Sequence, residues 1–159
     1  MNAAGLPGFA DHAFLRGIPA GSVARLAATA TAVSFPAGRR LFEEGAPARK
    51  CWLLTSGQVA LFLHAPGAED LIVETLCCDD VIGFSWLAPP HEWQFSAATV
   101  TATEAFELDG TAVMALCDRD RDLGYQLAQR FLAAAVRRLH ATRIRLLDLY
   151  GTPRARAGT

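Results

Sequence analysis

The sequence has little net charge and no apolar run of membrane-spanning length. Its 159 residues carry a formal net charge of −1, which gives no electrostatic reason to expect a nucleic acid or an anionic membrane as partner. The N-terminal segment lacks a basic stretch followed by an unbroken apolar run, so we expect no signal peptide. Charges or turn residues interrupt every apolar stretch well before it could span a bilayer. We therefore expect a cytoplasmic protein.

The sequence also lacks the patterns of metal sites and of common catalytic sites. Its four cysteines, Cys51, Cys77, Cys78 and Cys117, form no CxxC pair and no cluster with histidine, so we expect no metal and instead free, buried thiols. No Ser/His/Asp, Cys/His or paired-carboxylate arrangement has a supporting context. We therefore expect no catalytic residue and no enzyme.

Length and composition favour one globular domain over residues 1–159. The chain is 52% hydrophobic and 19% charged, and its length is sufficient to bury a core. Short apolar segments separated by Gly and Pro predict strands over 29–35, 40–43, 51–54, 58–64, 70–76, 96–101 and 105–108. Such regular spacing is typical of a sandwich or barrel, which we place at about 29–109. Ser56-Gly57 predicts a hairpin between the third and fourth strands, and Pro66-Gly67 a turn into the fifth.

Helices are predicted on both sides of the strands. The segments 11–16 and 22–28 are short helices, the second with Ser22 as N-cap, and another short helix runs through Val113, Met114 and Leu116. Residues 120–150 contain no Pro and one Gly and are rich in Ala, Leu, Arg and Gln, which predicts one long helix.

The long helix has two apolar stripes. One repeats every seven residues with a second position three residues later, as in a coiled-coil seam, and consists of Tyr125, Ala128, Leu132, Ala135, Leu139, Thr142, Leu146 and Leu149. The other, Leu127, Phe131 and Ala134, can face the chain's own barrel. Two apolar faces predict a homodimer through this helix. The alternative is a helix that lies wholly in a groove of its own domain. The rim of that groove would then carry four arginines, Arg137, Arg138, Arg143 and Arg145.

The order of elements and several local motifs resemble the cyclic nucleotide-binding domain of the catabolite activator/Fnr superfamily. The motifs are Phe-Pro-Ala-Gly at 35–38, Leu-Phe-Glu-Glu-Gly at 41–45, Trp-Leu-Leu-Thr-Ser-Gly-Gln-Val at 52–59, Asp-Asp-Val-Ile-Gly at 79–83 and Ala-Thr-Val-Thr-Ala at 98–102. The resemblance covers about residues 10–150. It implies a mainly β fold, a double-stranded β-helix or jelly roll, with short N-terminal helices and a long C-terminal dimerisation helix.

In that family a short cassette binds the cyclic phosphate, and here the cassette departs from the pattern. The family uses backbone amides at a helix start, a glutamate on the ribose and an arginine on the phosphate. Phe84 stands in the glutamate position and Ser96 in the arginine position, and no Lys or Arg lies between Lys50 and Arg119. The resemblance therefore implies weak binding of ordinary cAMP or none.

The cassette, residues 83–95, reads Gly-Phe-Ser-Trp-Leu-Ala-Pro-Pro-His-Glu-Trp-Gln-Phe and resembles a subgroup of short family members without a helix-turn-helix. One interpretation is a pocket for a flat, weakly charged ligand, nucleotide-like or aromatic, that stacks on Trp86 or Trp93. The other is that Phe84, Trp86 and Trp93 fill the pocket themselves. The candidate ligand contacts are Gly83, Phe84, Ser85, Trp86, Leu87, Ser96, Ala97 and Thr142.

Two functions follow from these two interpretations. The first is a sensor that binds a small ligand and signals through the dimer helix to a separate effector protein. The second is a ligand-free interaction or scaffold module. We expect no direct DNA binding, because the residues after Tyr150 are too few for a helix-turn-helix. His91 and Glu92 could form a polar gate or half a metal site, or could be ordinary loop residues.

Overall fold

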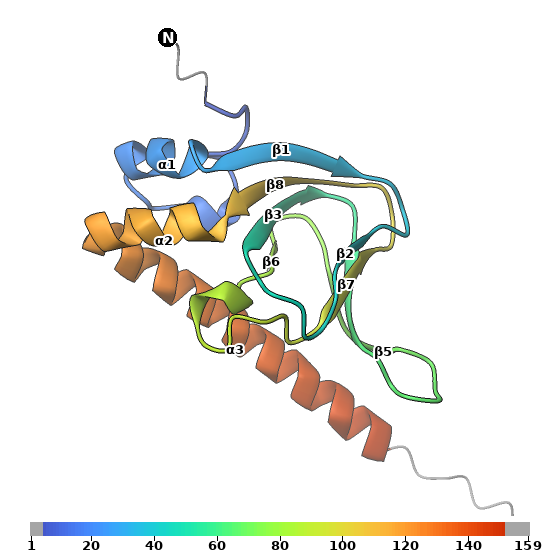
Figure 1. The fold of residues 1–159 in the computed structure, drawn as a ribbon. Helices are drawn as coiled ribbons and strands as arrows, with labels where there is room; N and C mark the ends of the chain where they lie inside the picture. The colour runs from blue at the N-terminus through green and yellow to red at the C-terminus, as the bar shows by residue number, and fades with distance from the viewer. Residues whose placement is uncertain (1–4, 152–159) are drawn as a thin grey trace, which may run out of the picture.

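The computed structural model describes residues 5–151 and contains two antiparallel four-stranded sheets that enclose a common interior (Figure 1). In hydrogen-bonded order, the first sheet consists of β1 (Ala30–Phe35), β8 (Thr103–Asp109), β3 (Lys50–Ser56) and β6 (Val81–Ile82). The second consists of β2 (Arg40–Phe42), β7 (Ser96–Thr99), β4 (Val59–Leu63) and β5 (Leu71–Leu76). This is the jelly roll that the family resemblance implies.

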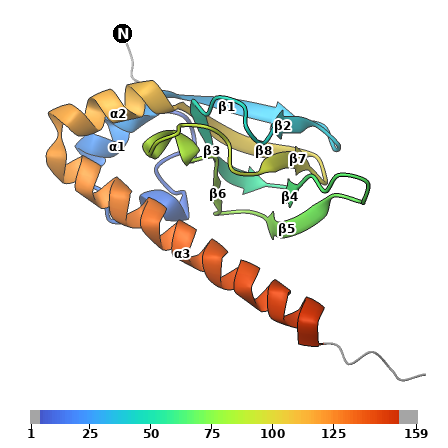
Figure 2. The ribbon, with the colours of Figure 1, turned by 60° about the horizontal axis from the view of Figure 1, so that its bottom comes forward.

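The helices lie at one end and along one side of this barrel (Figures 1 and 2). They are the short turns η1 (Ala13–Leu15) and η2 (Ser85–Leu87) and the α-helices α1 (Ala20–Ala27), α2 (Gly110–Arg119) and α3 (Arg121–Gly151). The predicted N-cap at Ser22 is wrong, because α1 already begins after Pro19, whose fixed φ suits the start of a helix. Ser22 instead donates its hydroxyl proton to Asp120 at 3.2 Å.

The predicted hairpin between the third and fourth strands is also wrong. β3 pairs with β8 and β6, whereas β4 pairs with β5 and β7, so the turn at Gly57 carries the chain from one sheet to the other. Gly57 has φ +84°, and a Cβ there would lie 2.3 Å from the carbonyl oxygen of Ala102. The turn therefore needs glycine for its φ and for the close approach of the 101–103 backbone. The turn after β4 does form a hairpin, with β5.

The two faces of α3 differ in burial. The Leu127, Phe131 and Ala134 side chains are buried in the chain's own core, as predicted. The predicted seam is largely exposed, with Tyr125 at 66%, Leu132 at 64% and Leu139 at 60%. The seam is therefore left uncovered by the chain's own barrel, and the homodimer stays a prediction. The side chain of Leu149 lies outside the described side chains.

The cysteines are less buried than the sequence analysis expects. All four cysteines are free, but only Cys51 is buried. Cys117 is half-buried, and Cys77 and Cys78 are exposed in the turn after β5, so the expectation of burial is wrong for these three.

Among residues 5–151, His, Cys, Asp and Glu side chains form no group of three or more that could hold a metal. Within that range no helix has the length and hydropathy needed to cross a bilayer. Residues 152–159, on which the expectation about DNA depends, lie outside the described part.

Candidate functional site

A cavity of about 380 Å³ lies between the cassette, the barrel interior and α3. We call it the α3 cavity. Its walls come from β2, β4, the cassette, the segment before β7 and α3, and its lining residues are Phe42, Leu61, Gly83, Phe84, Ser85, Trp93, Gln94, Phe95, Ala135, Arg138, Leu139 and Thr142. The volume falls in the range of pockets that take small organic molecules. Most of the lining is apolar.

The cassette backbone is fixed by its glycine. Gly83 has φ +80°, and a Cβ at this position would lie 2.9 Å from the ring of Trp52. Any larger residue would push against that buried indole, so the chain turns sharply here into η2. The Trp86 indole N–H donates to the Gly83 carbonyl oxygen at 2.8 Å and closes the turn. This geometry places Phe84 and Ser85 at the cavity wall.

Four of the eight candidate ligand contacts line the α3 cavity, and the other four do not. Gly83, Phe84, Ser85 and Thr142 line the α3 cavity, from two segments far apart in the chain. The other four lie off its wall. Trp86 is 6% exposed and packs edge-on against Phe131, with ring centroids 5.7 Å apart.

Leu87 lines a different hollow between α2 and α3. The Ser96 hydroxyl accepts a hydrogen bond from the Glu44 amide at 3.0 Å, and Ala97 is fully buried in β7. A ligand in the α3 cavity would therefore reach these three residues only after a rearrangement. Their role in binding stays a prediction.

Arg138 is the charged cavity residue that sequence reasoning missed as a ligand contact, and apolar or neutral wall residues such as Phe42, Leu61 and Gln94 were missed as well. Its guanidinium donates to the Glu74 carboxylate at 3.0 Å and to the Val81 carbonyl oxygen at 3.3 Å, and lies 5.0 Å from the Phe84 ring centroid. The available signal was its position one helical turn before Thr142. Among the described residues it is the one charged side chain that lines this cavity, and Glu74 already neutralises it. The cavity thus has a cation that is committed to an internal partner.

Residues 91–95, the last part of the cassette, have structural partners. Trp93 is 5% exposed and stacks on Phe42, with ring centroids 4.0 Å apart and an interplanar angle of 17°. The His91 ring Nδ1 lies 2.9 Å from the Trp86 carbonyl oxygen, and Glu92 pairs with Pro47 as an isolated β-bridge. These contacts fit the interpretation of His91 and Glu92 as loop residues. Phe95, next to Ser96, adds another apolar wall.

The cavity and the predicted seam share residues of α3. Ala135, Leu139 and Thr142 line the cavity and also belong to the seven-residue repeat. The Thr142 hydroxyl donates to the Arg138 carbonyl oxygen at 2.8 Å, so its proton is used within the helix and its oxygen remains able to accept. A ligand in the cavity would therefore touch the same helix face that a second copy would cover.

Comparison with known proteins gives the class. Residues 32–120, more than half of the chain, match the cyclic nucleotide-binding domain, and the chain belongs to that family. The CRP-like cAMP-activated global transcriptional regulator of Mycobacterium tuberculosis is 27% identical over 138 residues, which cover 86% of this chain and 59% of the regulator. The chain therefore spans about three fifths of the length of this curated relative.

Solved structures agree on the fold. The catabolite activator protein of Thermus thermophilus has a TM-score of 0.68 at 25% identity, covering 87% of this chain and 62% of its own. A cyclic nucleotide-binding domain of Methylobacillus flagellatus has a TM-score of 0.72 at 20% identity, covering 80% of this chain and 72% of its own. At the level of the family, the chain is a cyclic nucleotide-binding regulatory domain, and these relatives bear the names of regulatory or binding proteins and not of enzymes.

Proposed function

We propose that this chain is a sensor module that binds a small ligand other than ordinary cAMP in the α3 cavity and signals through a dimer helix to a separate partner protein. One observation carries the proposal: the cavity is bounded on one side by the cassette and on the other by Ala135, Leu139 and Thr142 of α3. Occupation of the cavity would shift the position or mobility of the helix face on which a partner copy depends.

The chemistry of the cavity supports a flat and largely apolar ligand. Phe84, Phe95 and Trp93 contribute aromatic surface, and Leu61 and Leu139 aliphatic surface. An aromatic ring or a nucleobase could stack on such walls. A charged phosphate would need the Arg138 guanidinium and would have to compete with Glu74 for it.

The relative from Mycobacterium tuberculosis is described as cAMP-activated, which makes cAMP the obvious rival ligand. Against it stand Phe84 and Ser96 at the positions expected for the glutamate and the arginine. Each missing charged hydrogen bond costs about 1.5–3 kcal/mol, or roughly one to two decades of affinity. The loss of both argues for a ligand without a ribose cyclic phosphate.

The scaffold function is the second candidate, and the burial of Trp86 and Trp93 favours it. Trp86 packs on Phe131 off the wall of the α3 cavity, and Trp93 forms part of that wall. A cavity of about 380 Å³ nevertheless remains, which is large enough for a small molecule. We therefore rank the sensor first.

A thermal-shift screen tests the proposal. Nucleotides, cyclic dinucleotides and small aromatic acids and amides are added to the wild type, since a ligand raises stability by RT ln(1 + [L]/Kd). A Gln94→Trp variant, which places a large side chain at the wall of the cavity opposite α3 and alters no residue of the helix, should abolish the shift. Gln58→Trp, an exposed position that lines none of the described cavities, should keep it. A shift that survives Gln94→Trp would contradict binding in this cavity.

A further inference from the structure

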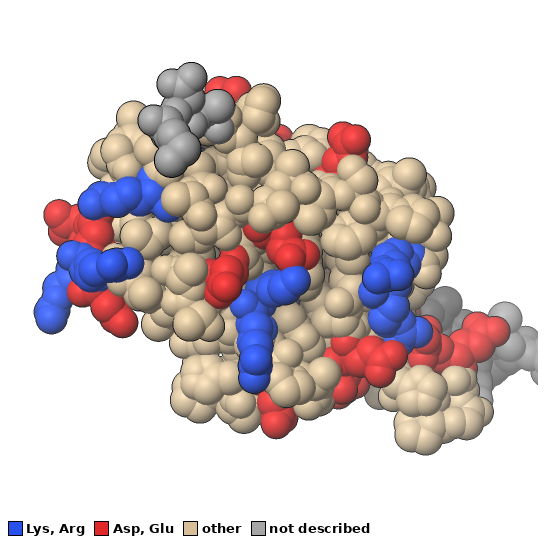
Figure 3. Space-filling view, turned by 45° about the horizontal axis from the view of Figure 1, so that its top comes forward, with Lys and Arg blue, Asp and Glu red and all other residues tan. Residues whose placement is uncertain are grey.

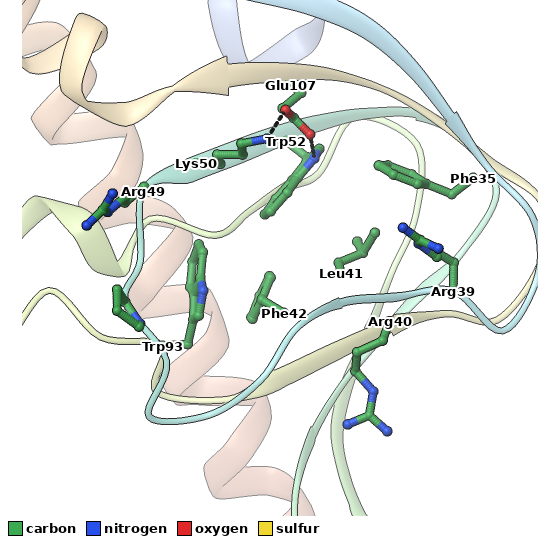
Figure 4. A pocket seen from close by; sticks show the side chains of 11 residues that line it. Phe35, Arg39, Arg40, Leu41, Phe42, Arg49, Lys50, Trp52, Trp93 and Glu107 are labelled. Atoms are coloured by element: carbon green, nitrogen blue, oxygen red, sulfur yellow. Dashed lines mark hydrogen bonds and ion pairs between the residues drawn. The ribbon is translucent and has the colours of Figure 1, made fainter.

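A second cavity, of about 360 Å³, shares Phe42 and Trp93 with the α3 cavity and opens on the other side of this stacked pair. Its walls are aromatic, with Trp52 parallel to Phe42 at 5.7 Å between ring centroids and Phe35 across the opening (Figure 4). We call it the basic cavity because of the charges at its rim. It contains no residue of α3 and none of residues 83–87, so it is distinct from the α3 cavity apart from the shared pair.

Four basic side chains, Arg39, Arg40, Arg49 and Lys50, and one acid, Glu107, line the basic cavity. In a chain with a net charge of −1, this is a local excess of positive charge. The face of the molecule in Figure 3 shows basic and acidic side chains interspersed, without one large field of either sign. The excess at this cavity is therefore a local property and suits a small anion better than an extended polyanion.

Both carboxylate oxygens of Glu107, the acidic residue at this cavity, already accept hydrogen bonds. One Glu107 carboxylate oxygen accepts from Lys50 Nζ at 2.5 Å, and the other accepts from the Trp52 indole N–H at 2.9 Å. Figure 4 shows this carboxylate bridging the two donors above the indole. Glu107 thus holds Trp52 in place and neutralises Lys50, and it does not neutralise the arginines.

The arginines differ in their partners. Arg40 pairs with Glu43 at 3.4 Å, lies 4.9 Å from the Phe62 ring centroid and points away from the other lining residues (Figure 4). Among residues 5–151, the guanidiniums of Arg39 and Arg49 make no ion pair, hydrogen bond or ring contact. They stand on opposite sides of the aromatic group in Figure 4. Two unpaired cations at the rim of an aromatic-lined cavity supply the chemistry that recognises an organic anion.

We propose that the basic cavity binds a small planar organic acid, whose ring lies against the Phe42, Trp52 and Trp93 wall and whose carboxylate is held by Arg39 or Arg49. A guanidinium can hold a carboxylate with two parallel hydrogen bonds, and the aromatic wall fits a flat apolar body. The volume is that of a small-molecule pocket. The proposal is independent of the ligand of the α3 cavity.

Calorimetric titration of 2-naphthoate into the full chain tests this proposal, with the neutral 2-naphthylmethanol and inorganic phosphate as comparison probes. The naphthoate should bind at least about tenfold more tightly than either probe, since only it combines the ring with the anion. Arg39→Gln or Arg49→Gln should weaken it by about tenfold. Both residues are exposed, so these variants should fold, which circular dichroism checks. Arg143→Gln, exposed on α3 and outside both cavities, is the matched control.

Three results would overturn the proposal. Equal binding of the acid and the alcohol would mean that no cation takes part. Affinity unchanged in both Arg39→Gln and Arg49→Gln would mean that this cavity is not the site. Affinity lost in Arg138→Gln and kept in the other two would place the acid in the α3 cavity instead.

Discussion

Replacement of Trp86 by alanine tests whether this residue is a core residue, as the structure has it, or a ligand contact. The side chain is 6% exposed, its indole N–H donates to Gly83, and its ring packs on Phe131. Truncation of a buried tryptophan to alanine typically costs about 3–5 kcal/mol, because a cavity remains. For a domain of this size, that corresponds to a fall in Tm of roughly 6–20 °C.

The assay is urea unfolding of the wild type and the variant by tryptophan fluorescence and circular dichroism, with Tm from calorimetry. Trp86→Phe separates the hydrogen bond from the packing, and it should cost about 1–3 kcal/mol for the unpaired carbonyl and the smaller ring. Val100→Ala, at a position that is 50% exposed, is the surface control and should stay within about 0.5 kcal/mol of the wild type. A Trp86→Ala variant that loses less than about 1 kcal/mol would refute the core assignment.

Two further predictions concern the helices. The double substitution Leu132→Glu and Leu139→Glu should give monomers in sedimentation experiments, because it buries charge in the seam. The control Val136→Glu, at an exposed position outside the seven-residue repeat, should leave the dimer intact. A double variant that stays dimeric would rule out this seam. The Asp120 carboxylate has its pKa held below the usual range by the hydrogen bond from the Leu123 amide, and further by Ser22 and Arg25. The contribution of Asp120 to folding stability is therefore complete above about pH 4 and is lost as the pH falls through the lowered folded-state pKa. Asp120→Asn should flatten the acid side of the plot of unfolding free energy against pH. An unchanged plot would contradict this.

The elements of the fold could be predicted because their signals are local. Apolar segments between Gly and Pro located seven of the eight strands of the described residues, and the absence of Pro from 120–150 located α3; the two-residue strand β6 was not predicted. The pairing of β3 with β8 could not be predicted, because a turn at Ser56-Gly57 is compatible with a hairpin and with a crossing between sheets. The long-range pairing of β3 with β8 and the close approach of Gly57 to the distant Ala102 distinguish the two.

The site was predicted in part, for a similar reason. Gly83, Phe84, Ser85 and Thr142 were found because family motifs mark their positions. Arg138 was not, because its place at the cavity depends on the rotation of α3, which the Glu74 pair and the buried Phe131 stripe fix together. The basic cavity was not predicted, because its aromatic and basic residues come from β1, β2, β3 and three loops.

Calorimetric titration of the wild-type chain with cAMP is the most direct test of the central claim, that this sensor module binds a ligand other than ordinary cAMP. We expect no micromolar binding, because the loss of two charged contacts removes roughly two to four decades of affinity. Micromolar binding of cAMP would contradict the account. It would mean that Arg138 leaves Glu74 for the phosphate, in which case Arg138→Gln would abolish the binding.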